Sequence, residues 1–94
     1  MSNSLLSNER ECLICGSTKD LHRHHIYEGI GRRKISDREG AWCYLCAFHH
    51  NMSKHGVHDD KGLDQYLKER CQLAWEFQNG TREDFRKMFG RNYL

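Results

Sequence analysis

Two short Cys/His pairs constrain the fold of this 94-residue chain more than any other feature of its sequence. Cys12 and Cys15 are separated by two residues, a spacing that puts two thiolates on one turn, within reach of a single tetrahedral zinc ion. Further along, the spacing returns in two overlapping forms, Cys43-x-x-Cys46 and Cys46-x-x-His49. The sequence therefore predicts one structural zinc held by Cys12, Cys15, Cys46 and His49, with Cys43 as the alternative fourth ligand.

A zinc site would compensate for the small size of the chain, because a short domain buries a smaller fraction of its surface than a long one. Hydrophobic residues make up only 37% of the sequence, but aromatic residues make up 11%, and this aromatic content argues against a disordered chain. The five cysteines, an odd number, do not make a closed set of disulfides. We expect a folded protein in the reducing cytoplasm, where Cys pairs bind metal more often than they form disulfides.

The hydrophobic pattern predicts an α+β fold. Strands are expected at residues 21–27 and 41–46, joined by a loop rich in Gly and Arg, and no run approaches the roughly 20 apolar residues of a membrane span. The expected organisation is a flexible tail (1–10) and a single domain (11–94), with a metal-binding core at about 11–60 and C-terminal helices at about 61–90.

Two helices are predicted in the C-terminal region. Apolar residues recur at three- and four-residue steps from Leu63 to Phe77, through Tyr66, which is typical of an amphipathic helix, and Gly80 is expected to end it. Thr81 with a carboxylate three residues later indicates a capping box, which begins a last helix that ends at the next glycine, residue 90. A shorter helix is expected earlier, around residues 51–52.

Seven histidines are more than one structural zinc can use. A strand–loop–strand–helix hairpin brings the first strand against the helix that follows the second, so His24, His50 and His58 are predicted to share a second, open metal site. An open divalent site suits hydrolysis, because the metal polarises a phosphoryl oxygen. His25 lies beside a predicted ligand, and a neutral imidazole takes a proton from water near neutral pH. His22 is expected to be a polar surface residue of the strand.

Adjacent residues of a regular strand point to opposite faces, so His24 and His25 can serve one cleft only if the strand twists or ends there. Arg32, Arg33 and Lys34 form a run of three cations in the predicted loop. The net charge of +2 gives no overall basic field, but such a run can meet phosphate oxygens of a nucleic acid; the alternative is an ordinary solvated charge run.

Together these motifs resemble the HNH endonucleases of the ββα-metal superfamily, over Cys12 to Leu94. The matching segments are the first Cys pair followed by "HRHHIYEG", then "GRRKISDREGAWCYLC", "FHHNMSKHGVH" and "FGRNYL". The chain is similar in particular to small phage and prophage proteins of this type. The resemblance implies a zinc-stapled ββα-metal (His-Me finger) core with two additional C-terminal helices, and hydrolysis of DNA phosphodiester bonds with one divalent ion: Mg²⁺, Mn²⁺, Ni²⁺ or Zn²⁺.

The resemblance also implies a role for each histidine of the motif. By position, His25 matches the general base, His24 and His50 match ligands of the catalytic metal, and His58 matches the further ligand, with His55 as the alternative. The same correspondence assigns the structural zinc to the Cys and His set predicted above.

One position departs from the family pattern. Many members carry an Asn on the second strand that orients the base, and the corresponding stretch here, Glu39-Gly40-Ala41-Trp42, has none. Arg33, in the predicted loop, is expected to contact a phosphate or to stabilise charge in the transition state.

Two function classes follow. The first is an HNH-type DNA endonuclease or nickase, and the alternative is a zinc-stapled module that binds DNA or a protein without catalysis. The expected partners are DNA and a phage or host recombination or packaging protein, with no membrane association, and the expected state is a monomer or a homodimer.

Overall fold

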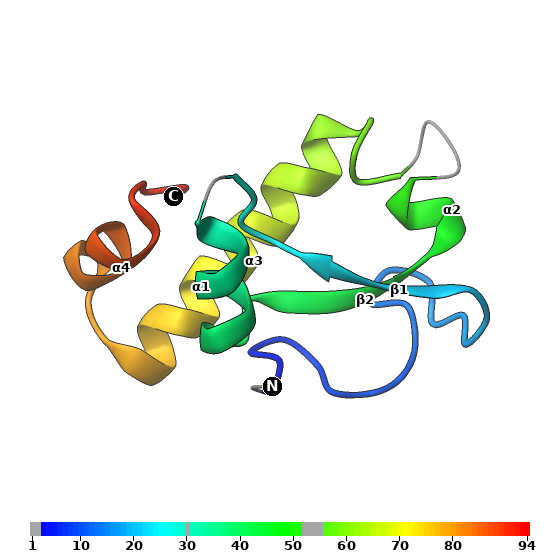
Figure 1. Ribbon diagram of the computed structural model, residues 1–94, viewed down its shortest axis with the longest axis horizontal. Helices are drawn as coiled ribbons and strands as arrows, with labels where there is room; N and C mark the ends of the chain where they lie inside the picture. The colour runs from blue at the N-terminus through cyan, green and yellow to red at the C-terminus, as the bar shows by residue number, and fades with distance from the viewer. Residues whose placement is uncertain (1–2, 30, 52–55) are drawn as a thin grey trace.

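The computed structural model describes residues 3–29, 31–51 and 56–94, and it has the α+β architecture predicted from the sequence. The elements, in chain order, are β1 (Leu21–His25), α1 (Arg32–Glu39), β2 (Trp42–Cys46), α2 (Ala47–His50), α3 (Lys61–Asn79) and α4 (Arg82–Phe89). The two strands cross the middle of the molecule, with α1 and α4 towards one end and α2 at the other (Figure 1). The sheet therefore connects two ends of the molecule that are built from different helices.

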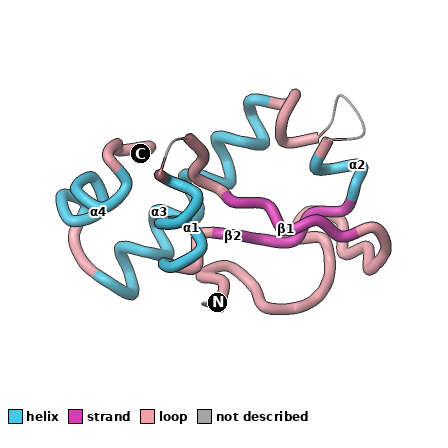
Figure 2. Tube along the Cα trace, in the orientation of Figure 1, coloured by secondary structure: helices cyan, strands magenta, loops and turns pink. Residues whose placement is uncertain are grey.

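The sheet is a two-stranded antiparallel pair, shown in magenta in Figure 2. Its register pairs His24 with Cys43 and His25 with Trp42. Because side chains alternate between the faces of a strand, His24 and Cys43 share one face, and His25 and Trp42 share the other. The adjacent histidines therefore lie on opposite faces of the sheet.

Between the strands the structure contains a helix, α1, where a loop was predicted. Glycines 31 and 40 flank it, both with left-handed backbone angles (φ 80° and 78°). Ser36 is its one buried residue, and its hydroxyl donates a hydrogen bond to the carbonyl of Tyr27 at 2.8 Å. A helix that buries a single serine has almost no hydrophobic periodicity, which explains why the sequence pattern did not reveal it.

The N-terminal segment differs from the loose tail that was predicted. Ser4 is buried and its hydroxyl donates to the carbonyl of Trp42, while the amide of Leu5 donates to the carbonyl of Gly40 at 2.8 Å. A Cβ at Gly40 would lie 2.2 Å from the carbonyl oxygen of Asn3, so only glycine permits this approach. The described part of the segment, residues 3–10, thus packs against the start of β2.

The C-terminal helices begin and end close to the predicted positions. Gly80 follows α3 directly, and the Thr81–Asp84 capping box that opens α4 is present, with both of its hydrogen bonds. Gly90 ends α4 with a left-handed backbone (φ 81°). Local sequence signals therefore fixed these boundaries.

The buried face of α3 is rotated from the predicted stripe. Its buried residues are Leu67, Cys71, Gln72 and Trp75. Tyr66 and Phe77, both assigned to the apolar stripe, are 49% and 92% exposed. α3 packs against α4, and Trp75 donates a hydrogen bond to Glu39 of α1, so the position of these partners rather than the sequence period alone selects the face that is buried.

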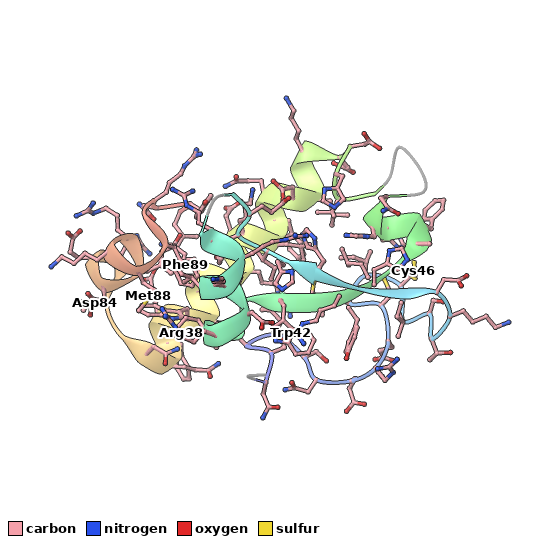
Figure 3. The ribbon with its side chains drawn as sticks, viewed as in Figure 1. Arg38, Trp42, Cys46, Asp84, Met88 and Phe89 are labelled. Carbon is pink, nitrogen blue, oxygen red and sulfur yellow. The ribbon has the colours of Figure 1, made fainter. Side chains whose placement is uncertain are left out.

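An aromatic core joins the sheet to the C-terminal helices. Tyr27, just after β1, packs its ring 5.4 Å from that of Phe85 and 4.7 Å from that of Phe89, the latter labelled in Figure 3. The hydroxyl of Tyr27 donates to the carbonyl of Lys68 at 2.7 Å, so this fully buried residue has its polar group satisfied. This core fixes the position of β1 relative to α3 and α4.

Candidate metal centres

Four side chains from residues 12–17, which we call the knuckle turn, and from the β2–α2 junction gather at one end of the sheet. The ligand atoms of Cys12, Cys15, Cys46 and His49 all lie within 4.8 Å of one another. Sγ of Cys15 is 3.7 Å from Sγ of Cys46. Nδ1 of His49 is 3.3 Å from Sγ of Cys46 and 3.6 Å from Sγ of Cys12.

These separations match the spacing that a tetrahedral zinc ion imposes on its ligands. Bonds of about 2.3 Å to sulfur and about 2.0 Å to nitrogen put two sulfurs about 3.8 Å apart and a sulfur and a nitrogen about 3.5 Å apart. The predicted ligand set is therefore brought together in a geometry that fits one metal ion, with His49 presenting Nδ1.

The backbone of the knuckle turn holds the first two thiols. The amide of Cys12 donates to the carbonyl of Ser17, and the amide of Gly16 donates to the carbonyl of Cys12, both at 2.8 Å. Gly16 has φ of 77°, a left-handed angle that glycine adopts without strain. The tight turn points both sulfurs towards the same side.

A further hydrogen bond connects this turn to the second half of the cluster. The amide of Leu13 donates to the carbonyl of Tyr44 in β2 at 2.9 Å. Cys46 is the last residue of β2 and the N-cap of α2, and Figure 3 shows it at the end of the strand beside that helix. His49 lies in the single turn of α2, so the change from strand to helix brings both ligands to the knuckle turn.

The electrostatics of the cluster favour one thiolate and resist a second. Burial raises the pKa of the Cys12 thiol, but hydrogen bonds from the backbone of Cys46, Cys15 and Ile14 and from the Cys15 side chain outweigh it and lower the pKa from 9.0 to about 6. The backbone hydrogen bond at Ser17 lowers the pKa of Cys15, but burial and the neighbouring Cys12 and Cys46 sulfurs raise it overall. A cation among these sulfurs would remove the conflict between them.

Cys43, the alternative ligand, lies outside this cluster. It is 1% exposed and sits opposite His24 on the core face of the sheet. Burial raises the pKa of its thiol to about 12, which keeps it protonated at neutral pH. Cys43 lies three residues before Cys46 in β2, away from the strand end that carries the cluster.

A second group consists of His24 on β1, His50 on α2 and His58 in the turn that follows. Their ligand nitrogens all lie within 4.8 Å of one another, and Nε2 of His50 is 3.1 Å from Nε2 of His58. Within the group His24 is buried, His50 is partly exposed and His58 is exposed. Three ligands with one side open to solvent resemble metal sites that keep a position for water or substrate.

His24 has the properties of a metal ligand. It is 2% exposed, and its Nε2 has no hydrogen-bond partner among the described residues. Burial, followed by the charges of His50 and His58, lowers its pKa to about 3. The pKa of His50 is also lowered by burial, to about 4. Both imidazoles are therefore neutral near pH 7 and offer lone pairs, which fits a divalent cation at this group.

A close backbone approach at Gly56 brings His58 to this group. A Cβ at Gly56 would lie 2.8 Å from the carbonyl oxygen of His50, closer than real Cβ atoms come. The amide of Val57 donates to the carbonyl of His49 at 2.8 Å, and the amide of His58 donates to that of His50 at 3.4 Å. These two hydrogen bonds hold the turn at residues 56–58 against the carbonyls of α2.

The structure does not bring His25 into the three-histidine group. His25 is the last residue of β1 and lies on the opposite face, with its Nε2 3.6 Å from a carboxylate oxygen of Asp37 in α1. The guanidinium of Arg23 contacts the same oxygen and lies 4.0 Å from the centre of the Trp42 ring. His25 is close enough to His24 that its charge contributes to the lowered pKa of that residue.

The prediction that His22 is only a surface residue is wrong. Its Nδ1 lies 2.8 Å from Nδ1 of His50, and the two ring centres are 4.9 Å apart. The two-residue spacing between His22 and His24 was the sequence signal, because it puts both on one face of β1. Asp37 had no such signal, because its helix was not predicted.

The cationic run occupies the first turn of α1 rather than a loop. Arg33 and Lys34 are exposed. Arg32 is partly buried, and a Cβ at Gly90 would lie 3.0 Å from its Nη2, so its side chain runs towards the end of α4. Two of the three predicted phosphate-binding residues thus face solvent. His55, the alternative metal ligand, lies outside the described residues.

Two carboxylates also lie near His24. Ligand atoms of His24, Glu28 and Asp64 are within 4.8 Å of one another. Nζ of Lys68 is 2.7 Å from a carboxylate oxygen of Asp64, so this group already has a counter-ion. The three-histidine group has no such counter-ion among the described residues, so it is the stronger metal candidate.

Comparison of the chain with protein-family models, with curated proteins and with solved structures finds no match. Within residues 3–29, 31–51 and 56–94, no helix combines the length and the apolar character needed to cross a membrane. The chemistry of the two groups of side chains is therefore the guide to function.

Proposed function

We propose that this protein is a metal-dependent endonuclease of the HNH type that hydrolyses DNA phosphodiester bonds. The observation that carries the proposal is the presence of two different metal-ligand groups on one small sheet. The cysteine-rich group offers four ligands, and the imidazole group offers three with an open side. Four ligands close a structural zinc site, whereas three leave a position for chemistry.

The arrangement of the second group supports hydrolysis. A strand, a short helix and a turn supply one histidine each, as the resemblance to ββα-metal nucleases implies. When bound there, a divalent cation would polarise a phosphoryl oxygen and stabilise charge on the leaving oxygen. The buried His24 would fix its position, and the exposed His58 would leave it accessible to a DNA backbone.

His25 is the proposed general base. The carboxylate of Asp37 faces its Nε2, which favours the tautomer with the proton on Nε2 and leaves the lone pair of Nδ1 to accept a proton from water. Arg23 holds that carboxylate in place. Asp37 would thus replace the Asn that the family carries on its second strand. We place the scissile phosphate across the end of β1, where side chains from both faces reach it.

The ligand set also indicates which metals the proposed site would use. Imidazole nitrogens bind Zn²⁺ and Ni²⁺ well, whereas Mg²⁺ prefers oxygen ligands and retains its water. Among Mg²⁺, Mn²⁺, Ni²⁺ and Zn²⁺, we expect Ni²⁺ or Zn²⁺ to occupy the three histidines most tightly. Arg33 and Lys34 would contact DNA phosphates, so each should contribute about one unit to the salt dependence of DNA affinity.

The test is cleavage of supercoiled plasmid by the zinc-loaded protein with each added metal, read as nicked or linear product. His25→Ala should lower the cleavage rate by about 10²- to 10⁴-fold, the usual contribution of a general base, while zinc content and circular dichroism stay unchanged. Asp37→Asn should give a smaller loss, because it disturbs the base without removing it. Gln78→Ala, which replaces an exposed and uncharged residue near the end of α3, is the control and should cleave like wild type.

Cleavage by His25→Ala at the wild-type rate would disprove the assignment of the base. Absence of nicking by wild type with all four metals would disprove catalysis. In that case the alternative function, a zinc-stapled module that binds DNA or a protein, would hold. The separation of His25 from the three-histidine group is the observation that keeps this alternative in view.

A further inference from the structure

His22 contacts the predicted metal ligand His50 at Nδ1 of His50, the ring nitrogen that would not bind the metal. Nδ1 of His50 faces Nδ1 of His22 at 2.8 Å, and Nε2 of His50 faces Nε2 of His58 at 3.1 Å. The two rings are nearly perpendicular, at 85°. His50 therefore has a different histidine on each of its nitrogens.

The two distances indicate different kinds of contact. Two nitrogens bound to one tetrahedral ion with bonds of about 2.0–2.1 Å lie about 3.3 Å apart. The separation of 3.1 Å on the Nε2 side is close to that value, but 2.8 Å on the Nδ1 side is shorter and matches an N–H to nitrogen hydrogen bond. His22 is thus a hydrogen-bond partner of His50 rather than a further ligand.

The direction of this hydrogen bond follows from the chemistry of imidazole. A neutral ring has one N–H and one lone pair, and a metal takes the nitrogen with the lone pair. If His50 binds metal through Nε2, its proton is on Nδ1 and is donated to Nδ1 of His22. His22 then carries its own proton on Nε2. Both rings remain neutral, and both nitrogens of each have defined roles.

We propose that His22 is a positioning residue of the three-histidine site, which accepts the Nδ1–H of His50 and so fixes the tautomer and ring orientation in which His50 Nε2 binds a divalent metal. This inference rests on the proposed metal site. The partners of a metal-bound histidine commonly act in this way, and their loss costs about 10- to 100-fold in metal affinity. His22 reaches His50 because the strand register puts it on the same face as His24, opposite Leu45.

The experiment titrates Ni²⁺ into the zinc-loaded full chain by calorimetry and compares two substitutions. His22→Leu removes the acceptor, so the Kd for Ni²⁺ at the second site should rise by about 10- to 100-fold. His22→Asn places an amide oxygen near the position of Nδ1, so it keeps the acceptor and should restore most of the affinity. Tyr44→Phe, on the opposite face of the sheet, is the control and should bind like wild type.

A second measurement does not depend on any variant. Nitrogen-15 NMR of the wild-type histidines should show His50 protonated at Nδ1 and His22 protonated at Nε2. An Nε2-protonated His50 in the Ni²⁺-free protein would overturn the inference even if His22→Leu fails to fold.

The calorimetric outcomes separate this inference from the proposed function. Wild-type affinity in His22→Leu would overturn the role of His22 and leave the metal site standing. Equal losses in both variants would also overturn it, because an amide oxygen replaces an acceptor but not an imidazole ligand. A wild-type protein that binds zinc at the cysteines and no Ni²⁺ would overturn both this inference and the proposed catalytic site.

Discussion

At the scale of single residues, buried thiols make the stability of this protein sensitive to alkaline pH. Burial raises the pKa of Cys71, in α3, from 9.0 to about 12, although a hydrogen bond with Tyr27 lowers it. In the unfolded chain the thiol ionises near pH 9, while in the folded protein it stays protonated. Because the folded pKa is the higher one, the stability that Cys71 contributes is complete below pH 9 and is lost as the pH rises towards 12.

We therefore expect the free energy of unfolding to fall less steeply above pH 9 in Cys71→Ala than in wild type, by up to about 1.4 kcal/mol per pH unit. Urea unfolding of the zinc-loaded protein at pH 8, 9 and 10 measures the slope. Leu67→Ala, one turn earlier on the same buried face, is the control: it creates a cavity without removing an ionisable group, so it should keep the wild-type slope. Equal slopes for wild type and Cys71→Ala would contradict the prediction.

Some of the residue contacts at the site could be predicted from the sequence, and others could not. The sequence predicted that His24, His50 and His58 would lie together, because the order of strand, strand and helix brings the first strand against the helix that follows the second. The environment of His25 required Asp37, which belongs to a different element with no spacing relation to it. The order of elements and the spacing of residues can be read from the sequence, whereas the contacts of an element that has no pattern of its own depend on packing.

At the scale of elements, the same distinction explains the missed helix. α3 and α4 have caps and apolar repeats, so their bounds were predictable. α1 has an N-cap, Gly31, without a side-chain hydrogen bond, and it meets the core through the buried Ser36 and the partly buried Ile35. Its formation depends on two left-handed glycines and on the turn at Tyr27, and neither produces a hydrophobic period.

The turn after α2 gives a prediction at this scale. Gly56→Ala would place a methyl group 2.8 Å from the carbonyl oxygen of His50, so the chain must move away from α2. The hydrogen bonds from Val57 and His58 to the α2 carbonyls should be lost, and His58 should move away from His50. We expect Gly56→Ala to retain the cysteine-bound zinc and to weaken Ni²⁺ binding at the three histidines by tenfold or more.

Calorimetry with Ni²⁺ and elemental analysis for zinc measure both parts of this prediction. Gly62→Ala is a matched control, because a Cβ there would meet only the side chain of Asp60, at 3.3 Å. An unchanged Ni²⁺ affinity in Gly56→Ala would show that the turn does not position His58. Loss of zinc together with Ni²⁺ would show that the two groups are not independent.

At the scale of the whole molecule, the two ends of the sheet depend on different kinds of stabilisation. Aromatic residues hold α4 to β1 through Tyr27, whereas the end near Cys46 has the four-ligand cluster and a helix of one turn. Such a helix is too short to be stable alone. Structural zinc sites contribute about 10–16 kcal/mol of apparent binding energy in small peptides, which is comparable with the whole stability of a small domain.

Loss of the zinc ligands should therefore destabilise the protein far more than loss of the proposed catalytic ligands. We expect Cys12→Ser, or removal of zinc with a chelator, to lower the thermal midpoint sharply and to abolish the ordered NMR signals of the knuckle turn and α2. His58→Ala should remove only the Ni²⁺ site and change the free energy of unfolding by less than about 1 kcal/mol, as is usual for an exposed side chain. Calorimetric melting of wild type, Cys12→Ser and His58→Ala measures the difference.

The comparison of Cys12→Ser with His58→Ala also tests whether the cysteine-rich group is structural while the three-histidine group is not. If both substitutions lowered the thermal midpoint equally, the three histidines would be a structural site, and the argument for an open catalytic metal would fail. If neither lowered it, the aromatic core would suffice for folding, and the cysteines would require another explanation. A large effect of Cys12→Ser beside a small effect of His58→Ala is expected only if the first metal holds the fold and the second is free to take part in chemistry.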